Sequence, residues 1–132
     1  MPGGYTKRNL RTEIDDQAQA FGFSPNLEFR VARDALETTE SALSFMRLAP
    51  GFRLPFGHHH ELQEEVYVVV SGSAKLKLGD EILELEPWDA VRIAPGVVRD
   101  IEGGDQGTEL LLFGAPRVPP GDAVTEQDWW TD

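Results

Sequence analysis

The sequence predicts a mostly β, single-domain protein with little helix, and two features of the chain carry this prediction. Short apolar runs are broken by glycine and proline at close intervals, which is typical of strands joined by tight turns. Within several runs apolar and polar residues alternate with a period of two, as in a strand with one buried face. The 132 residues, 40% of them hydrophobic, are enough for one core. Many short antiparallel strands at this spacing favour a sandwich or a small barrel of the jelly-roll kind.

The first strands are expected at residues 27–31 and 42–48. The earlier segment alternates apolar with charged side chains, and the later one is an apolar run that a Pro-Gly turn ends. Ahead of both we expect a short helix over residues 10–21, with Asn9 as its N-cap and Gly22 as its stop. Its apolar face would carry Leu10, Ile14, Ala18 and Phe21.

Residues 66–70 have no polar side chain on either face. This pattern favours a strand covered on both sides, as when a barrel wall also packs against another sheet or subunit. We therefore expect a homodimer, and the alternative is that the chain's own termini provide the cover.

A hairpin is expected over residues 74–85, with a two-residue Gly-Asp turn in its middle. This turn would pair Leu76 with Leu83 and Lys75 with Glu84. One register then satisfies both the apolar and the charged face, which strengthens the prediction.

Three further strands are expected at residues 90–93, 97–101 and 108–113. A Pro-Gly turn at residues 94–96 and a Gly-rich turn at residues 103–107 would separate them.

The C-terminal end is expected to run as an extended arm, because residues 115–121 carry three prolines. Trp129 and Trp130 are too apolar to hang free, and we expect them to anchor the arm to the body or to a neighbouring subunit. Trp88, which follows a proline, is expected to pack against the protein rather than to stack on a substrate.

Charge and composition exclude several classes of function. With 12 basic and 23 acidic residues the formal charge is −11, which disfavours nucleic acid and anionic membranes as partners. The chain has no cysteine, so any metal site must be built from histidine and carboxylate. No signal-peptide pattern and no membrane-spanning apolar run is present, and a cytoplasmic location is expected.

All three histidines lie at residues 58–60, directly before the apolar run. Imidazole and carboxylate are ligands of zinc, iron, nickel and manganese alike, so the cluster predicts a divalent transition-metal centre without distinguishing among these metals. Side chains at i and i+2 of a strand point to the same side, about 6.5 Å apart. This spacing selects His58 and His60 and turns His59 away from the site.

A third ligand should be a carboxylate from the next element, and either Glu64 or Glu65 is suitably placed. Unbroken alternation favours Glu64. A polar bend at residues 61–63 would destroy that alternation, so parity alone leaves the choice open.

Around these residues the chain resembles the cupin superfamily. His58-x-His60, four residues, Glu65, six residues and Gly72 reproduce the spacing of the first cupin motif, with the apolar strand between. The resemblance implies that His58, His60 and Glu65 are metal ligands, so that Glu65 is preferred to Glu64.

The resemblance is strongest to the small single-domain cupins of uncharacterised function. It implies a cupin barrel over residues 42–114. Residues 1–41 would form an N-terminal arm and the first strands, and residues 115–132 a C-terminal arm.

The second cupin motif is incomplete in this chain. It usually ends in a Pro-x-Gly-x-x-His turn whose histidine is the fourth ligand, and Arg99 occupies that position here. A guanidinium stays protonated and has no lone pair for a cation, so the metal would lack one protein ligand. Alternation with Val97 and Ile101 places Arg99 on an apolar face, where it needs a partner. The alternatives are an acid such as Glu65, an anionic ligand, or solvent at the barrel mouth.

Three weaker candidates lie near the motif. Tyr67 shares the parity of Glu65, which makes it a candidate catalytic acid or hydrogen-bond donor to a ligand. Gln63 is a candidate to orient His60 or to contact the ligand. Arg92 is expected outside, paired with an acidic neighbour.

Three functions fit these residues. The first is a small cupin that binds a divalent transition metal, a small organic ligand with a negative group, or both, and that could act as a metal-dependent enzyme. The second is a metal-free, non-catalytic binding module for small molecules centred on Arg99. The third is a structural or oligomerisation domain. Resemblance at the level of the fold does not select a reaction.

Overall fold

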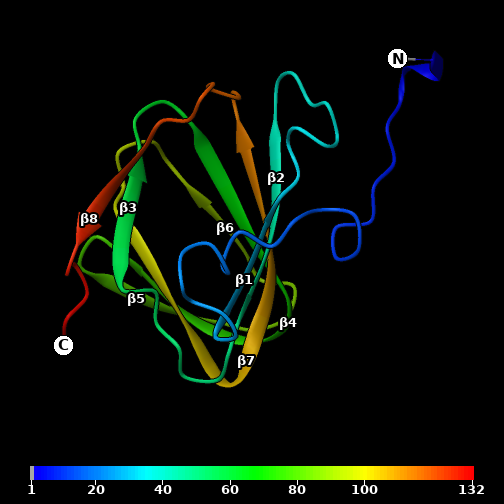
Figure 1. Cartoon of the computed structure of the whole chain (residues 1–132). Coiled ribbons are helices and arrows are strands. Elements are labelled where there is room, and N and C mark those ends of the chain that lie inside the picture. Colours follow the sequence, from blue (N-terminus) through cyan, green and yellow to red (C-terminus); the bar gives the residue numbers. More distant parts are fainter. Residues whose placement is uncertain (1) are drawn as a thin grey trace.

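A computed structural model describes residues 2–132, and nearly all of its regular structure is strand (Figure 1). The strands pair antiparallel and curl into a barrel, which confirms the predicted fold class. Within residues 2–132 no helix is long and apolar enough to span a membrane. The elements are a 3-10 turn at Pro2–Gly4, β1 (Leu27–Val31), β2 (Ala42–Leu48), β3 (Phe56–His60), β4 (Glu64–Leu78), β5 (Glu81–Leu85), β6 (Ala90–Ile93), β7 (Arg99–Ala115) and β8 (Ala123–Gln127).

Strand β7 is the centre of the sheet. The strand order is β1-β2-β7-β3-β8, and β7 also pairs with β4, which in turn pairs with β5 and β6. The C-terminal half of β7 lies beside β2, whereas Arg99 at its start lies opposite His58 of β3. One strand therefore connects the apolar wall of the barrel to the histidine cluster.

The hairpin over residues 74–85 is confirmed with its register. Leu76 lies opposite Leu83 and Lys75 opposite Glu84, as the alternation predicts. The strands predicted at residues 27–31, 42–48 and 90–93 are confirmed as β1, β2 and β6.

The core fills the space between the inward faces of these strands. The central strands β4 and β7 contribute Val69 and Leu110, both without exposed surface. The buried cluster consists of Ala18, Leu27, Met46, Leu48, Leu54, Tyr67, Val69, Ala74, Leu76, Leu85, Ile93, Ile101, Leu110 and Leu112.

The helix predicted over residues 10–21 is wrong. One helical turn begins at Asn9, whose carbonyl accepts a hydrogen bond from the N–H of Glu13 at 3.0 Å. The chain then leaves that path, because Asp16 forms a β-bridge with Arg30 on the free edge of β1. Short isolated helices are marginal in water, so this pairing with the sheet prevails over the helical pattern.

The Gly-rich turn predicted at residues 103–107 is also wrong. β7 runs through these glycines and joins the strands expected at residues 97–101 and 108–113. A Cβ on Gly103 would lie 2.5 Å from the carbonyl oxygen of Ala49. The glycine therefore allows two backbones to approach closely within a sheet and does not mark a break in the strand.

The C-terminal segment contains a strand that the sequence pattern did not predict. β8 pairs antiparallel with β3, so that part of the expected arm belongs to the sheet (Figure 1). The expected anchor is confirmed for Trp130, which is 7% exposed and lies under the guanidinium of Arg53 at 3.9 Å. Trp129 lies 4.3 Å from the ammonium group of Lys77.

Trp88 does not pack against the body of the protein, contrary to the prediction. Trp88 is 75% exposed and lies in the turn between β5 and β6. The turn is fixed by the carboxylate of Asp89, which accepts a hydrogen bond from the N–H of Glu86 at 2.8 Å. This local bond and a left-handed backbone at Trp88 direct the indole to solvent.

The two faces of residues 66–70 differ in burial. Tyr67 and Val69 are buried inside the barrel, whereas Val66, Val68 and Val70 are half-buried on its outer surface. Within one chain, the outer face of this strand is therefore only partly covered. A homodimer stays a prediction.

Candidate metal and ligand site

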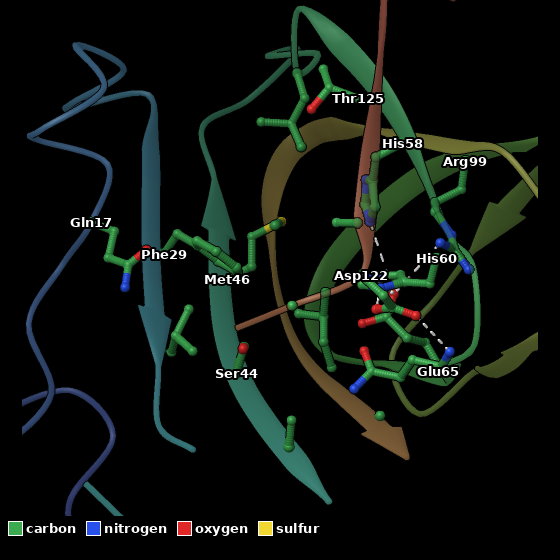
Figure 2. A pocket seen from close by; sticks show the side chains of 18 of the residues that line it. Gln17, Phe29, Ser44, Met46, His58, His60, Glu65, Arg99, Asp122 and Thr125 are labelled. Carbon is green, nitrogen blue, oxygen red and sulfur yellow. Dashed lines mark hydrogen bonds and ion pairs between the residues drawn. The ribbon is translucent and has the colours of Figure 1, made fainter. Parts of the chain in front are cut away.

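Two histidines of β3 and one glutamate of β4 come together inside the barrel (Figure 2). Each of His58, His60 and Glu65 offers a ligand atom, and these atoms lie within 4.8 Å of one another. The Nε2 atoms of His60 and His58 lie 3.1 Å and 4.0 Å from Oε1 of Glu65. The two imidazole rings are 5.1 Å apart and nearly perpendicular. His58 and His60, two residues apart on one strand, therefore point to the same side, as expected from the sequence.

The bend at residues 61–63 decides between the two glutamates. Glu65 is 8% exposed and faces the histidines, whereas Glu64 is exposed and pairs with Arg92 at 3.5 Å. Alternation counted straight through the bend would have chosen the wrong residue, because the bend interrupts the strand before β4 begins. The expected outward position of Arg92 is confirmed.

His59 points away from the cluster, as expected for its position between the other two histidines. Its Nδ1 atom lies 3.2 Å from Oε1 of Glu126, a residue of β8. This histidine is therefore a natural control for the other two.

Asp122 is the residue of the site that sequence reasoning missed. Its Oδ1 atom lies 2.7 Å from Nδ1 of His60, and its Oδ2 accepts hydrogen bonds from the N–H groups of Leu62 and Gln63. Hydrogen bonding at Nδ1 directs the Nε2 atom of His60 toward Glu65 and fixes the ring orientation. Asp122 lies 62 residues after His60, directly before β8, and no local motif connects the two.

The ionisation of these groups follows from their surroundings. Burial, reinforced by the charge of Arg99, lowers the pKa of His58 to about 4, so this imidazole is neutral at pH 7. Burial also acts to lower the pKa of His60, but Glu65 and Asp122 outweigh it and raise the value. Burial opposes ionisation of Asp122, yet its hydrogen bonds from His60, Leu62 and Gln63 prevail and lower its pKa to about 2.

Arg99 is the most unusual side chain of the site. It is 1% exposed, and none of its three guanidinium nitrogen atoms makes a hydrogen bond within the described chain. The nearest acidic atom is Oε1 of Glu65, 3.8 Å from Nη1, and this oxygen also makes no hydrogen bond. A buried cation with several unsatisfied donors is strongly unfavourable unless another group meets it.

The position of Arg99 is fixed by the turn that precedes β7. The N–H of Gly96 donates to the carbonyl oxygen of His60 at 2.7 Å, which ties this turn to the end of β3. Arg99 then pairs with His58 in the sheet register. The Pro-Gly turn predicted at residues 94–96 is therefore confirmed, and it holds Arg99 against the histidine strand.

Tyr67 and Gln63 both line the same cavity. Burial, reinforced by the charge of Glu65, raises the pKa of Tyr67 well above its usual value, so the phenol keeps its proton. The side chain of Gln63 donates to the carbonyl oxygen of Pro116 at 3.3 Å. Gln63 therefore does not orient His60, contrary to one of its two predicted roles, and Asp122 makes this contact instead. Roles for Tyr67 and Gln63 toward a ligand stay predictions.

A cavity of about 420 Å³ connects these groups to the barrel mouth. Its volume falls within the usual range for small-molecule pockets. The charged groups, with Glu65 and Arg99 among them, gather at one end, whereas Phe29 and Met46 lie at the other end together with the uncharged polar residues Gln17 and Ser44 (Figure 2).

The fold has counterparts among solved structures. The chain is similar to a cupin protein from Bacteroides fragilis, with a TM-score of 0.70 and 25% sequence identity, covering 88% of this chain and 87% of the other. The chain has the cupin fold. It is also similar to KdgF from Halomonas sp., with a TM-score of 0.69 and 17% identity, covering 88% and 96% of the two chains.

A third similar structure is a variant of PAC13 from Streptomyces determined with uridine. The TM-score is 0.64 and the identity 16%, covering 77% of this chain and 79% of the other chain. No protein-family model matches the sequence, and no curated protein is significantly similar to it. At these identities the comparisons establish the fold, and function must be argued from the site.

The donor set of this chain fits a divalent transition metal. His58, His60 and Glu65 offer two imidazole nitrogens and a carboxylate, which zinc, iron, nickel and manganese all accept. Oε1 of Glu65 faces both imidazoles without making a hydrogen bond, and Asp122 orients His60, and both features are suited to a cation. Arg99, whose Nη1 lies 3.8 Å from Oε1 of Glu65, adds a positive charge to this donor set and no donor atom.

Proposed function

We propose that this cupin binds a divalent transition metal through His58, His60 and Glu65, together with a small organic anion held by Arg99. The observation that carries the proposal is the buried guanidinium of Arg99, whose nitrogen atoms have no hydrogen-bond partners beside a cluster of metal-ligand donors. An anionic group of a ligand would satisfy these donors with charge-assisted hydrogen bonds.

The charges of the site support binding of both partners. Arg99 contributes one positive charge, and Glu65 and Asp122 contribute one negative charge each, so with neutral imidazoles these groups carry a net charge of about −1. A divalent ion would change this to about +1 in a cavity shielded from water, and a monoanion would balance it. Such an ion would supply Lewis acidity toward an oxygen atom of the ligand.

Each residue of the site has a separate part in this proposal. His58 stays neutral and keeps a lone pair, Asp122 orients His60, and Arg99 positions the anion. The protonated phenol of Tyr67 is a hydrogen-bond donor on the cavity wall. The similarity to PAC13, whose structure was determined with uridine, supports a small organic molecule as occupant.

The test of the metal is a titration of tag-free protein with zinc, manganese, nickel and iron(II), combined with elemental analysis. We expect one ion per chain, and we expect His58→Ala and His60→Ala each to weaken binding at least tenfold. His59→Ala is the matched control, because His59 belongs to the same strand but contacts Glu126. Fewer than about 0.1 metal ions bound per chain, or equal losses of metal affinity in all three variants, would reject the metal site.

A metal-free binding module is the second candidate, and one observation favours it. Glu65 already has two partners with positive or protonatable groups, Arg99 at 3.8 Å and His60 at 3.1 Å. These contacts would stabilise the carboxylate without an ion. Anion binding that is unchanged by a chelator and by His58→Ala would favour this candidate over the first.

We also propose that two copies associate through the outer surface of β4. Val66 and Val68 are half-buried there, and the neighbouring Phe113 of β7 is 41% exposed. A second copy would complete the cover expected for a strand that is apolar on both faces. Sedimentation at micromolar concentration should show a dimer that Phe113→Lys dissociates, whereas Ile82→Lys, at an exposed position of β5, should not. A wild-type monomer would contradict the proposal.

A further inference from the structure

We infer that the organic ligand is an amphipathic carboxylate, with its anionic head at Arg99 and an apolar chain or ring along the wall formed by Phe29, Met46 and Leu112. This inference rests on the proposed function, because it needs an anion at Arg99. It adds the chemical class of the remainder of the molecule.

The sheet register places the wall next to the charged end of the cavity. Glu65 lies opposite Gly114, which lies opposite Ala42, so small residues flank the site. The next inward row contains Tyr67 and Leu112, with the hydroxyl-bearing Ser44 opposite Leu112. This row leads away from the histidines into the barrel.

The row after that contains Phe29 opposite Met46. Inward residues of a strand are about 6.5 Å apart, so these two rows carry the apolar surface about 13 Å away from the row of Glu65. Figure 2 shows Phe29 and Met46 side by side, on the opposite side of the space from His60 and Arg99. The cavity is therefore charged at one end, whereas apolar side chains predominate along the rest of its length, with Ser44 and Gln17 as polar exceptions.

The other arginines of the cavity lining already have partners. Arg117 pairs with Asp34 at 2.6 Å and also donates to the carbonyl oxygen of Thr38, and Arg33 donates to the carbonyl oxygen of Pro120 at 3.3 Å. Among the arginines of the described cavity lining, Arg99 is therefore the cation left for a ligand, because none of its three guanidinium nitrogen atoms makes a hydrogen bond. A ligand with one anionic head matches this arrangement.

The exposed part of the cavity lining also includes apolar side chains. Phe21 is 63% exposed, and Val118 and Pro120 of the C-terminal segment line the same cavity, together with polar residues such as Gln17 and Thr125. The end of a hydrophobic chain that extends beyond the buried wall can contact Phe21, Val118 and Pro120.

A polyhydroxylated acid would fit this cavity poorly. Its hydroxyl groups would exchange water for the side chains of Phe29, Met46 and Leu112, which offer no hydrogen bonds of comparable strength. Buried hydroxyls without partners reduce affinity, whereas buried methylene groups increase it. The wall therefore discriminates between apolar carboxylates and sugar acids.

The test is calorimetric titration of the full chain, with and without a saturating divalent ion, using butanoate, hexanoate, octanoate, 3-phenylpropanoate and gluconate as probes. We expect affinity to rise about fourfold for each added methylene group until the cavity is filled. Hexanoate should bind at least tenfold more tightly than gluconate, which has the same number of carbon atoms.

Two kinds of variant test separately the binding of the ligand's carboxylate head and the binding of its apolar part. Arg99→Met should weaken every carboxylate at least tenfold. Met46→Gln, which nearly preserves side-chain volume, should weaken octanoate about fivefold or more and leave butanoate almost unchanged. Phe29→Gln, at a half-buried position, provides the same test if the Met46 variant unfolds.

The outcomes distinguish this inference from the proposed function. Equal affinity for hexanoate and gluconate, or no dependence on chain length, would overturn the amphipathic ligand while leaving Arg99 as an anion site. If none of the five carboxylates binds, the anionic-ligand part of the proposed function fails as well. The metal titration described above tests the metal site independently of both.

Discussion

The Nη1 atom of Arg99 lies 3.8 Å from Oε1 of Glu65, and neither atom makes a hydrogen bond within the described chain. The same carboxylate oxygen lies 3.1 Å from Nε2 of His60. Glu65 is therefore shared between a cation that cannot be a metal ligand and an imidazole that can. The metal affinity of the site therefore depends on whether Glu65 pairs with Arg99 or binds a metal together with His60.

Replacing Arg99 by histidine should strengthen metal binding. Arg99→His removes a positive charge from the vicinity of Glu65 and adds a nitrogen donor at the position where the second cupin motif has one. We expect the dissociation constant for zinc or manganese to fall at least tenfold in a competition titration with a chromophoric chelator. Arg92→His is the control, since Arg92 is exposed and pairs with Glu64. An unchanged constant would show that Arg99 does not adjoin the metal.

Removing the charge of Asp122 should weaken the metal site through His60. Asp122→Asn still fills the space but no longer holds the Nδ1–H of His60 with a carboxylate, and losses of this kind amount to about 10–100-fold in metal affinity. The same titration measures the effect. Glu126→Gln is a matched control, because Glu126 contacts the outward-facing His59. Equal behaviour of the two variants would contradict the role of Asp122.

The sequence was informative where a local pattern was sufficient. The hairpin register follows from alternation and one turn, and the inward direction of His58 and His60 follows from strand parity. Glu65 was reached through motif spacing, because the bend before β4 makes parity unreliable.

Elements that depend on distant pairing could not be predicted in this way. The helix pattern after Asn9 was overridden by the bridge between Asp16 and Arg30. The glycines near Gly103 allow close strand packing, although in the sequence they are typical of a turn. Asp122 acquires its role only when β8 pairs with β3 and brings it to His60. Each of these contacts joins segments with no sequence signal of their proximity.

Glu28 should stabilise the fold in a pH-dependent manner. It is buried and accepts hydrogen bonds from Arg30, Arg11 and Arg47 at 2.6 to 3.2 Å. Burial opposes ionisation, but these hydrogen bonds outweigh it and lower the pKa of Glu28 from 4.5 to about 2. The stabilisation is therefore present above pH 4.5 and is lost as the pH falls toward 2.

We expect Glu28→Gln to lower the free energy of unfolding by roughly 2–3 kcal/mol at pH 7, measured by urea denaturation. The difference from the wild type should shrink between pH 4.5 and pH 2. Glu84→Gln, at an exposed position of β5, should change stability by less than about 0.5 kcal/mol. A difference that is constant with pH would contradict the assignment of the stabilisation to an ionised Glu28.

Trp130 is buried whereas Trp88 is exposed, so substitutions of these two residues should affect stability differently. Trp130→Ala should lower the free energy of unfolding by about 3 kcal/mol or more, because it removes a buried indole and its stacking with Arg53. Trp88→Ala should have an effect below about 0.5 kcal/mol, since Trp88 is 75% exposed. Thermal and urea unfolding measure both. Similar losses would mean that Trp88 is covered in solution, as by a second copy of the chain.

The central claim is that His58, His60 and Glu65 together hold a metal beside an uncoordinated Arg99. The most direct measurement is anomalous diffraction from crystals soaked in manganese or zinc, with data collected above and below the metal absorption edge. We predict one anomalous peak within bonding distance of His58, His60 and Glu65, with the guanidinium of Arg99 outside the coordination sphere. No peak at this position in metal-soaked crystals, with Glu65 still beside Arg99, would contradict the claim.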